Sequence, residues 1–200
     1  MTARGAATRA RIVEAAAGLI YDRGVGGTSL DDVMRASSTS KSQLYHYFAD
    51  KDALIGAVIQ AQTCRVLAFQ ATLLDHVETL AGLRGWRDAI VAATEAACGV
   101  GGCPLGTLGS ELADRSENAR ALVAEGFQAW ELRLASCLRR LREHGELDPG
   151  AEPNDLAASL IGALQGGLLL AQTTRTVRSL KLVLDMALEH VGSRAKAGVL

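Results

Sequence analysis

A short run of residues from Ser40 to Phe48 carries side chains suited to reading DNA. The carboxamide of a glutamine can pair with adenine and the ammonium of a lysine can reach guanine acceptors, so Gln43 and Lys41 are candidates for contacts with base edges. The residues of this run that we expect at a DNA surface are Ser40, Lys41, Ser42, Gln43, Tyr45, His46 and Tyr47. The alternative is an aromatic core patch, and for His46 a place at the rim of the surface is as consistent with the sequence as a DNA contact.

The spacing around this run predicts the helices that position it. Ser40 with Gln43 three residues later matches a capping box and begins a very short helix, whose Leu44 and Phe48 are expected to face inward. Ser29 is expected to cap another short helix, with acidic residues in its first turn. A longer helix is expected before both, over residues 8–23. Two short capped helices separated by about three residues predict a helix-turn-helix, whose second helix presents its N-terminal turn to the major groove.

Residues 8–59 resemble the TetR family of bacterial transcriptional repressors. The matching residues are Arg11-Ile12-Val13-Glu14-Ala15-Ala16, Gly24, Thr28-Ser29-Leu30-Asp31-Asp32-Val33, Ser40-Lys41-Ser42-Gln43-Leu44-Tyr45-His46-Tyr47-Phe48 and Lys51-Asp52-Ala53-Leu54. The resemblance implies a homodimeric repressor that reads a pseudo-palindromic operator and is released by a small-molecule inducer. An activator of the same family is an alternative that the sequence leaves open.

The resemblance also implies roles for single residues. Tyr45, Lys51, Thr28 and Ser29 would contact phosphates, and Tyr47 would contact the DNA backbone or a thymine. Ser42 and Gln43 would touch bases. Arg4 and Arg9, in an N-terminal arm expected to be flexible, could reach the minor groove or phosphates.

The turn of the predicted helix-turn-helix departs from the family pattern. Family members usually have Ala-Gly-Val where this chain has Ser37-Ser38-Thr39. A left-handed conformation at Ser38 would cost about 1 kcal/mol without glycine. Gln43 stands where threonine or serine is common, which bears on the operator sequence.

Composition places the whole chain in the all-α class. The 200 residues are 48% hydrophobic and 22% charged and include three prolines, which favours a globular helical protein. We expect residues 1–50 to form the DNA-binding domain and residues 51–200 a helical ligand-binding and dimerisation domain. The net charge of -1 excludes a wholly basic nucleic-acid coat. Later helices are expected over residues 86–98, 108–113 and 116–144.

The stretch from Leu156 to Thr174 has no charged residue and is about as long as a membrane span. Its glycines, glutamines and threonines favour a buried helix at a protein interface, which Pro153 would open at a first-turn position. The N-terminus lacks the apolar run of a signal peptide. We therefore expect a cytoplasmic protein with reduced cysteines and no membrane partner.

The second domain is expected to hold an inducer cavity. The large aromatic side chains could line such a cavity or belong to the core, and Gln165 and Glu95 are candidate polar anchors. The predicted ligand-binding residues are Phe69, Trp86, Glu95, Phe127, Trp130 and Gln165. Few charges among them favour a small lipophilic or aromatic inducer.

The last two helices are the expected dimer surface, although their apolar stripes could instead be buried within one subunit. Small residues on the first and an apolar stripe on the second would let two helices from each subunit pack into a four-helix interface. The predicted interface residues are Ala163, Gly166, Gly167, Leu180, Val183, Leu184, Ala187 and Leu188.

No catalytic set can be assembled from the four scattered histidines, so we expect no enzyme activity, no cofactor and no metal. The glycine-rich residues 101–106 lack the Gly-Lys-Ser/Thr ending of a phosphate loop and are expected to connect two helices. Cys103 lies between glycine and proline, and an exposed thiol there could act as a redox or electrophile sensor, an alternative to a passive small residue.

Overall fold

The computed structural model describes residues 2–195, which form nine helices. Contacts divide the chain into two compact units. Unit 1 contains the residues up to 65 together with 107–126, and unit 2 contains 66–106 together with the residues from 127 onward. The predicted domain of residues 1–50 falls inside unit 1, which also takes in the start of the following helix and a later segment. The functional division at residue 50 stays a prediction.

Unit 1 begins with three helices, α1 (Ala3–Arg23), α2 (Leu30–Ser37) and α3 (Lys41–Tyr47). Residues 3–7, expected to be a flexible arm, are helical because Thr2 caps α1 by accepting a hydrogen bond from the Gly5 amide. α1 ends at Gly24, whose φ of 72° lies in the left-handed region that glycine tolerates. The buried core of these helices includes Ile12, Ala16, Val33 and Leu44.

Three helices run from one unit into the other: α4 (Lys51–Leu74), α6 (Pro104–Leu112) and α7 (Glu117–Glu143). Asp50 caps α4, as its carboxylate accepts a hydrogen bond from the Ala53 amide at 2.7 Å. α7 runs close to the predicted range. α6 begins four residues earlier than expected, because Pro104 occupies its first position, where a missing N–H costs nothing.

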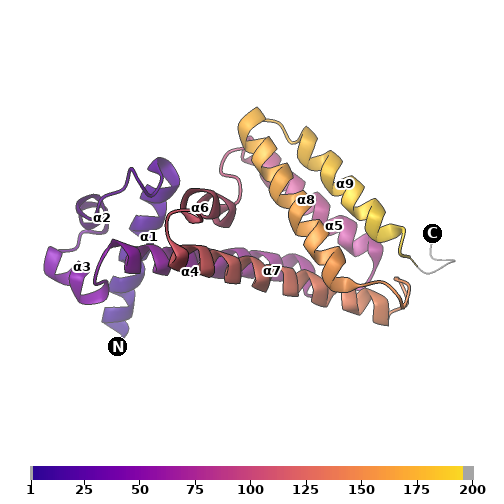
Figure 1. Cartoon of the computed structure of the whole chain (residues 1–200), viewed down its shortest axis with the longest axis horizontal. Helices are drawn as coiled ribbons and strands as arrows, with labels where there is room; N and C mark the ends of the chain where they lie inside the picture. The colour runs from indigo at the N-terminus through magenta and orange to yellow at the C-terminus, as the bar shows by residue number, and fades with distance from the viewer. Residues whose placement is uncertain (1, 196–200) are drawn as a thin grey trace. The chain divides into compact units, whose positions relative to one another are not determined.

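Unit 2 is completed by α5 (Leu80–Ala96), α8 (Pro153–Thr174) and α9 (Arg178–Gly192). α5 begins six residues before the expected start, capped by Thr79. α9 lies beside α8 and also packs against α5 (Figure 1). At the α8–α9 crossing Gly167 lies so close to α9 that a Cβ there would meet Leu180 Cδ1 at 2.7 Å.

α8 is the one helix among residues 2–195 that is long and apolar enough to cross a membrane, judged by length and composition alone. Its first residue is Pro153, as predicted. Its buried side chains include Leu156, Leu160 and Leu164, and a neighbouring helix packs along it. In this structure α8 therefore packs against α9 within unit 2.

Candidate nucleic-acid interface and ligand pocket

The recognition helix α3 is started by the capping box that the sequence predicts. The Ser40 hydroxyl accepts a hydrogen bond from the Gln43 amide at 3.2 Å, and the Gln43 side-chain oxygen accepts one from the Ser40 amide at 2.9 Å. This exchange satisfies two backbone donors at the exposed end of the helix. It also fixes the Gln43 carboxamide, whose NH2 group is left to face outward.

The inner and outer sides of α3 are clearly separated. Leu44 is 0% exposed and Phe48 is 2% exposed, so both anchor the helix in unit 1 as predicted. Tyr45 is exposed and Tyr47 is half-buried, which confirms that the pair does not share one buried face. The exposed side chains of α3 and its N-cap residue are Ser40, Lys41, Ser42, Gln43, Tyr45 and His46. α3 thus presents a polar rim with one aromatic ring, a combination able to contact both bases and phosphates.

Two contacts order the aromatic part of this rim. The Lys41 ammonium lies 6.0 Å from the centre of the Tyr45 ring, and the His46 and Tyr47 rings meet edge to face at 4.9 Å. Arg9, placed in the predicted flexible arm, instead lies on α1 with its guanidinium 5.1 Å from the centre of the Phe48 ring. Arg4 is exposed on the same helix.

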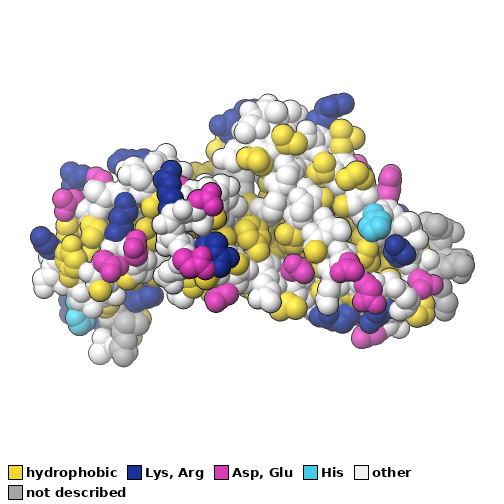
Figure 2. Space-filling model, in the orientation of Figure 1, with side chains coloured by type: hydrophobic (Ala, Val, Ile, Leu, Met, Phe, Trp, Pro, Cys, Tyr) yellow, Lys and Arg dark blue, Asp and Glu magenta, His cyan; other side chains and the backbone are white. Residues whose placement is uncertain are grey.

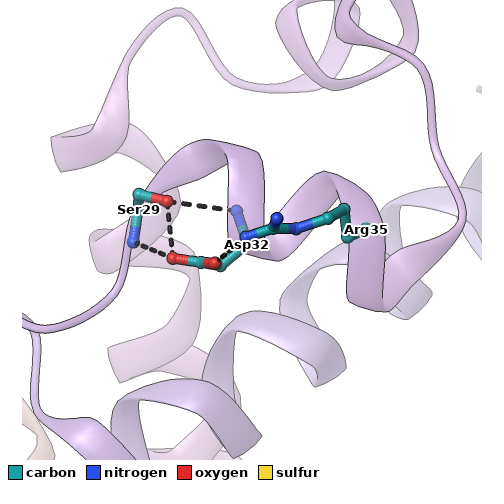
Figure 3. Close-up of polar contacts among 3 residues, drawn as sticks. All are labelled: Ser29, Asp32 and Arg35. Carbon is teal, nitrogen blue, oxygen red and sulfur yellow. Dashed lines mark hydrogen bonds and ion pairs between the residues drawn. The ribbon is translucent and has the colours of Figure 1, made fainter.

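The N-terminus of α2 is a second candidate phosphate contact. The Ser29 hydroxyl accepts a hydrogen bond from the Asp32 amide at 3.1 Å, and the Asp32 carboxylate accepts from both the amide and the hydroxyl of Ser29 (Figure 3). Arg35 forms an ion pair with the same carboxylate. The hydrogen bonds from Ser29, with a smaller contribution from Arg35, lower the pKa of Asp32 from 3.8 to about 2. Asp32 therefore stays ionised and holds the start of α2 at neutral pH.

Thr28 does not match its predicted role. It is 3% exposed, and its hydroxyl donates to the Gly24 carbonyl oxygen at 2.9 Å. Its side chain closes the turn after α1 and is not available to a phosphate. Lys51 is half-buried, and its ammonium donates to the Val25 carbonyl oxygen at 2.7 Å, which leaves its other N–H groups for a phosphate.

The turn between α2 and α3 has the strain expected from its sequence. Ser38 lies in the left-handed region with φ 51° and ψ 44°, which confirms the conformation that the family pattern assigns to glycine. The buried hydroxyls of Ser37 and Thr39 share a hydrogen bond of 2.7 Å, and Arg11 donates to the Ser37 carbonyl oxygen at 2.8 Å. These bonds hold the turn although Ser38 is unfavourable there.

Unit 2 contains an apolar pocket of about 250 Å³. Its lining comes from α4, α5, α7 and α8 and from the segment before α6, and none of the lining residues is charged. Of the predicted ligand-binding residues, Phe69 and Trp130 line it. The indole N–H of Trp130 is buried and has no hydrogen-bond partner among the described residues.

The other four predicted ligand-binding residues lie outside this lining. Trp86 is buried and donates to the Gln70 side-chain oxygen at 2.8 Å, and Glu95 is exposed and paired with Lys181 at 3.5 Å. Phe127 shares a helix face with Trp130, as expected from their spacing, with ring centres 6.5 Å apart. Gln165 lies beside the segment that precedes α6. Gln70, a buried glutamine in the lining, was not predicted, because an isolated glutamine in a long helix carries no sequence signal.

Cys103 is also part of the pocket lining and is buried, which disfavours the alternative of an exposed sensor thiol. Its sulfur accepts a hydrogen bond from the Gly106 amide at 3.4 Å. Burial raises the pKa of the Cys103 thiol despite this bond. The thiol is therefore held in its protonated, less reactive form.

A larger hollow of about 530 Å³ lies between α5 and α9, but its walls are charged. Arg87 there pairs with Asp88 and Asp185, each at 2.8 Å. These charges already satisfy one another, so the hollow does not suit an apolar ligand.

The predicted dimer residues divide into two groups. Gly167, Leu180, Leu184 and Ala187 are buried within the chain, which corrects their assignment to a dimer surface. Their stripe packs inside unit 2, because an apolar helix face is first covered by the neighbouring helices of its own chain. Gly166 is exposed, and Ala163, Val183 and Leu188 are half-buried.

A different set of apolar side chains is exposed on α8 and α9. Leu182 and Met186 are 54% and 63% exposed and lie one turn apart on α9, and Leu169 and Leu170 are exposed on α8. We call these four residues the outer α8–α9 surface, and Figure 2 shows hydrophobic side chains over both helices. The four residues of this surface were not predicted, because single apolar residues outside the main stripe of a helix are common on protein surfaces.

Comparisons with known proteins agree with this architecture. Residues 12–58 match the family described as bacterial regulatory proteins, tetR family, and residues 79–187 match the family described as tetracyclin repressor-like, C-terminal domain. An uncharacterised HTH-type transcriptional regulator in the lacX 3' region of Lactococcus lactis is 30% identical over 195 residues, covering 94% of this chain and 96% of the relative. The HTH-type transcriptional repressor DhaR of Mycobacterium sp. is 26% identical over 185 residues, 90% of each chain.

Solved structures show the same fold. A TetR-family transcriptional regulator from Cytophaga hutchinsonii superposes with a TM-score of 0.84 at 22% identity, covering 98% of both chains. A SmeT–triclosan complex superposes with a TM-score of 0.72 at 24% identity, covering 97% of this chain and 94% of the other.

Proposed function

From the premise that this chain belongs to the TetR family of DNA-binding transcriptional regulators, which are not enzymes, we propose that it is a homodimeric repressor released from its operator by a small apolar inducer. The observation that carries the proposal is α3, a capped helix with a buried apolar side and an exposed polar rim. Such a helix fits the major groove with its first turn toward the bases. The repressor DhaR among the relatives favours repression over activation.

We propose roles for the residues of the rim. Ser42 and Gln43 contact base edges, with the free Gln43 NH2 group donating to a purine acceptor. The other predicted residues, Ser29, Ser40, Lys41, Tyr45, His46, Tyr47 and Lys51, contact the sugar–phosphate backbone or the edge of the site. The N-termini of α2 and α3 add partial positive charge toward phosphate.

Dimerisation is supported by the outer α8–α9 surface. Leu182 and Met186 would pack against the same residues of a second copy, giving a four-helix contact around a two-fold axis. Such symmetry would place two α3 helices on successive turns of the major groove, about 34 Å apart, and so match a pseudo-palindrome. We therefore assign the homodimer to this surface, with Gly166 and the half-buried Ala163, Val183 and Leu188 at its edge.

The inducer is assigned to the apolar pocket of unit 2. With no charged lining residue, a charged ligand would lose its hydration without compensation, so a neutral lipophilic or aromatic molecule fits best. The complex of the neighbour SmeT with triclosan supports a small-molecule ligand in this fold. The repressor would act in the cytoplasm, where it meets its operator.

Selection of bound sites from random duplexes, followed by mobility-shift titration, tests the proposal. We expect a pseudo-palindromic site whose binding weakens steeply with salt. Gln43→Ala should relax base preference at one position per half-site by about 1–3 kcal/mol. Gln43→Ala also removes half of the capping box. Gln43→Glu is the control that separates the two effects, because glutamate keeps the cap but cannot donate a hydrogen bond to a base. Failure to select any duplex at low salt would contradict the proposal.

A reporter gene placed behind the selected site separates repression from activation. We expect reporter output to fall when the protein is expressed. A rise in output would instead assign the protein to the activators of the family.

A further inference from the structure

The turn that joins α1 to α2 is held by a carboxylate from α6. Glu111 accepts hydrogen bonds from the amides of Val25 and Gly26, at 2.9 and 3.0 Å, one on each carboxylate oxygen. All three residues lie in unit 1, although 85 or more positions separate them in the sequence. A bidentate, charged contact of this kind is stronger and more directional than a neutral hydrogen bond. We call it the Glu111 clamp.

The clamped turn is a junction of the DNA-binding helices. Gly24 begins it, and a Cβ at Gly24 would lie 3.2 Å from both Glu111 oxygens, so the carboxylate fits closely only against glycine. The Lys51 ammonium, at the start of α4, bonds to the Val25 carbonyl oxygen of the same turn. The turn therefore joins the end of α1 to the start of α2 and is bonded to the start of α4, which begins four residues after the last residue of α3.

The other end of α6 belongs to the apolar pocket. Gly102, Cys103 and Pro104 line that pocket, and Pro104 is the first residue of α6. From Pro104 to Glu111 the helix rises about 10 Å, at about 1.5 Å per residue. One short helix thus carries pocket lining at its start and the clamp in its last turn.

We propose that Glu111 is the positioning residue that makes the DNA affinity of the helix-turn-helix depend on the position of α6. This inference rests on the proposed inducer-released function, which it deepens by assigning the route from pocket to DNA. An occupant that displaces Cys103 and Pro104 moves α6 and withdraws the carboxylate from the Val25 and Gly26 amides. The turn then loses its anchor, and α2 and α4 leave the arrangement that matches the operator.

Glu111→Gln isolates the clamp with little change in shape. A carboxamide can accept from one of the two amides, but its NH2 group faces the other N–H, so one of the two bonds becomes a repulsive contact. We expect operator affinity to fall about tenfold, the change that corresponds to the loss of one charge-assisted bond. Asp114→Asn is the matched control, since it removes one exposed negative charge just after α6 and should leave affinity unchanged.

A double-mutant cycle tests whether α6 transmits a displacement, without needing the natural ligand. A Cβ at Gly106 would lie 2.8 Å from the Gln165 side-chain oxygen and 3.4 Å from Cys103 Cβ. Because that oxygen is the end of a flexible side chain and can yield to a small group, a large group is needed, and Gly106→Trp should displace the first turn of α6. We expect Gly106→Trp to lower operator affinity about tenfold in the native background and to add nothing to Glu111→Gln. Gly85→Trp, at an open position on α5, is the control for an added tryptophan in unit 2. Additive effects of the two changes would overturn the inference.

Amide hydrogen exchange provides a readout independent of DNA. In Gly106→Trp, the amides of Val25 and Gly26 should exchange faster than in the native protein while α1 itself stays protected. Circular dichroism confirms that the variant is folded. Unchanged exchange at both amides in a folded variant also overturns the inference.

A neutral fluorescent probe, N-phenyl-1-naphthylamine, separates this inference from the proposed function. If the bound probe lowers the operator affinity of the native protein but not that of Glu111→Gln, both are supported. If it lowers both affinities equally, the clamp is not the route, although the inducer pocket stands. If the bound probe changes neither affinity, the assignment of the inducer pocket fails, and the double-mutant cycle alone decides the clamp.

Discussion

Lys51 is a side chain of unit 1 that contributes to the fold and for which we also propose a DNA contact. Its ammonium bonds to the Val25 carbonyl oxygen and keeps further N–H groups available. Lys51→Ala should weaken binding to every duplex and reduce the salt slope by about one for each subunit, because each copy loses one proposed phosphate contact. Titrations at several salt concentrations measure this slope. An unchanged slope would show that Lys51 acts only within the protein.

Ser38 is a residue whose replacement should improve stability. Its left-handed backbone destabilises the folded protein by about 1–2 kcal/mol in any residue with a Cβ. Glycine removes this cost, but part of the gain is offset because glycine loses more conformational entropy on folding. Since the exposed side chain of Ser38 packs against little, Ser38→Gly should stabilise the protein by up to about 1 kcal/mol. Urea unfolding of the two proteins measures the difference. A less stable variant would contradict the strain at this turn.

The cysteines differ in environment and should differ in reactivity. Cys64 and Cys98 are exposed, whereas Cys103 and Cys137 are buried, and burial raises the pKa of Cys137 to about 11. We expect Cys64 and Cys98 to react with a thiol reagent in the native protein at neutral pH, and the two buried thiols only after unfolding. Mass spectrometry of labelled peptides identifies the sites. Rapid labelling of Cys103 would restore the thiol-sensor alternative.

At the scale of elements, the short helices α2 and α3 depend on their caps. Eight and seven residues are too few for a helix to be stable alone in water, so each needs its capping box and a buried apolar side. The capping box of α2 is charged, whereas that of α3 is neutral, so only the first should respond to acid.

The α2 cap predicts a pH dependence with a definite sign. The pKa of Asp32 is lowered to about 2 in the folded protein, so its contribution to stability is fully present above its ordinary pKa of 3.8 and is lost as the pH falls toward 2. Asp32→Asn should therefore melt at a lower temperature than the native protein at pH 6, and the gap should narrow below pH 4. Thermal unfolding by circular dichroism across this range measures the gap. A constant gap would contradict the shifted pKa.

At the scale of the whole molecule, the proposed binding to a pseudo-palindromic operator requires two copies of the chain. Leu182→Glu and Met186→Glu introduce charge on the outer α8–α9 surface, where it would be buried without a partner in the dimer. We expect both variants to fold, to become monomeric and to lose most of their operator affinity. Leu132→Glu is the control, because Leu132 is equally exposed but lies on α7. Analytical ultracentrifugation reports the oligomeric state, and variants that remain dimeric would locate the interface elsewhere.

The sequence by itself was sufficient for the helix-turn-helix. The capping box of α3, the Ser29 cap of α2 and the buried Leu44 and Phe48 were all predicted, and so was the cost of a left-handed Ser38, because each depends on residues within a few positions of one another. Local spacing also identified the last helices and the proline that opens α8. These features follow from periodicity and capping, which act within single helices.

The tertiary structure decided everything that depends on which residues meet across the chain. In the folded chain Thr28 and Cys103 are buried, and the apolar stripe of α9 packs against Gly167. Leu182 and Met186 remain exposed. Glu111 contacts the turn after α1. A helical stripe shows that one face is covered but not whether the cover comes from the same chain or a second copy. A carboxylate 85 positions away leaves no local pattern, because its contact is made only when the helices pack.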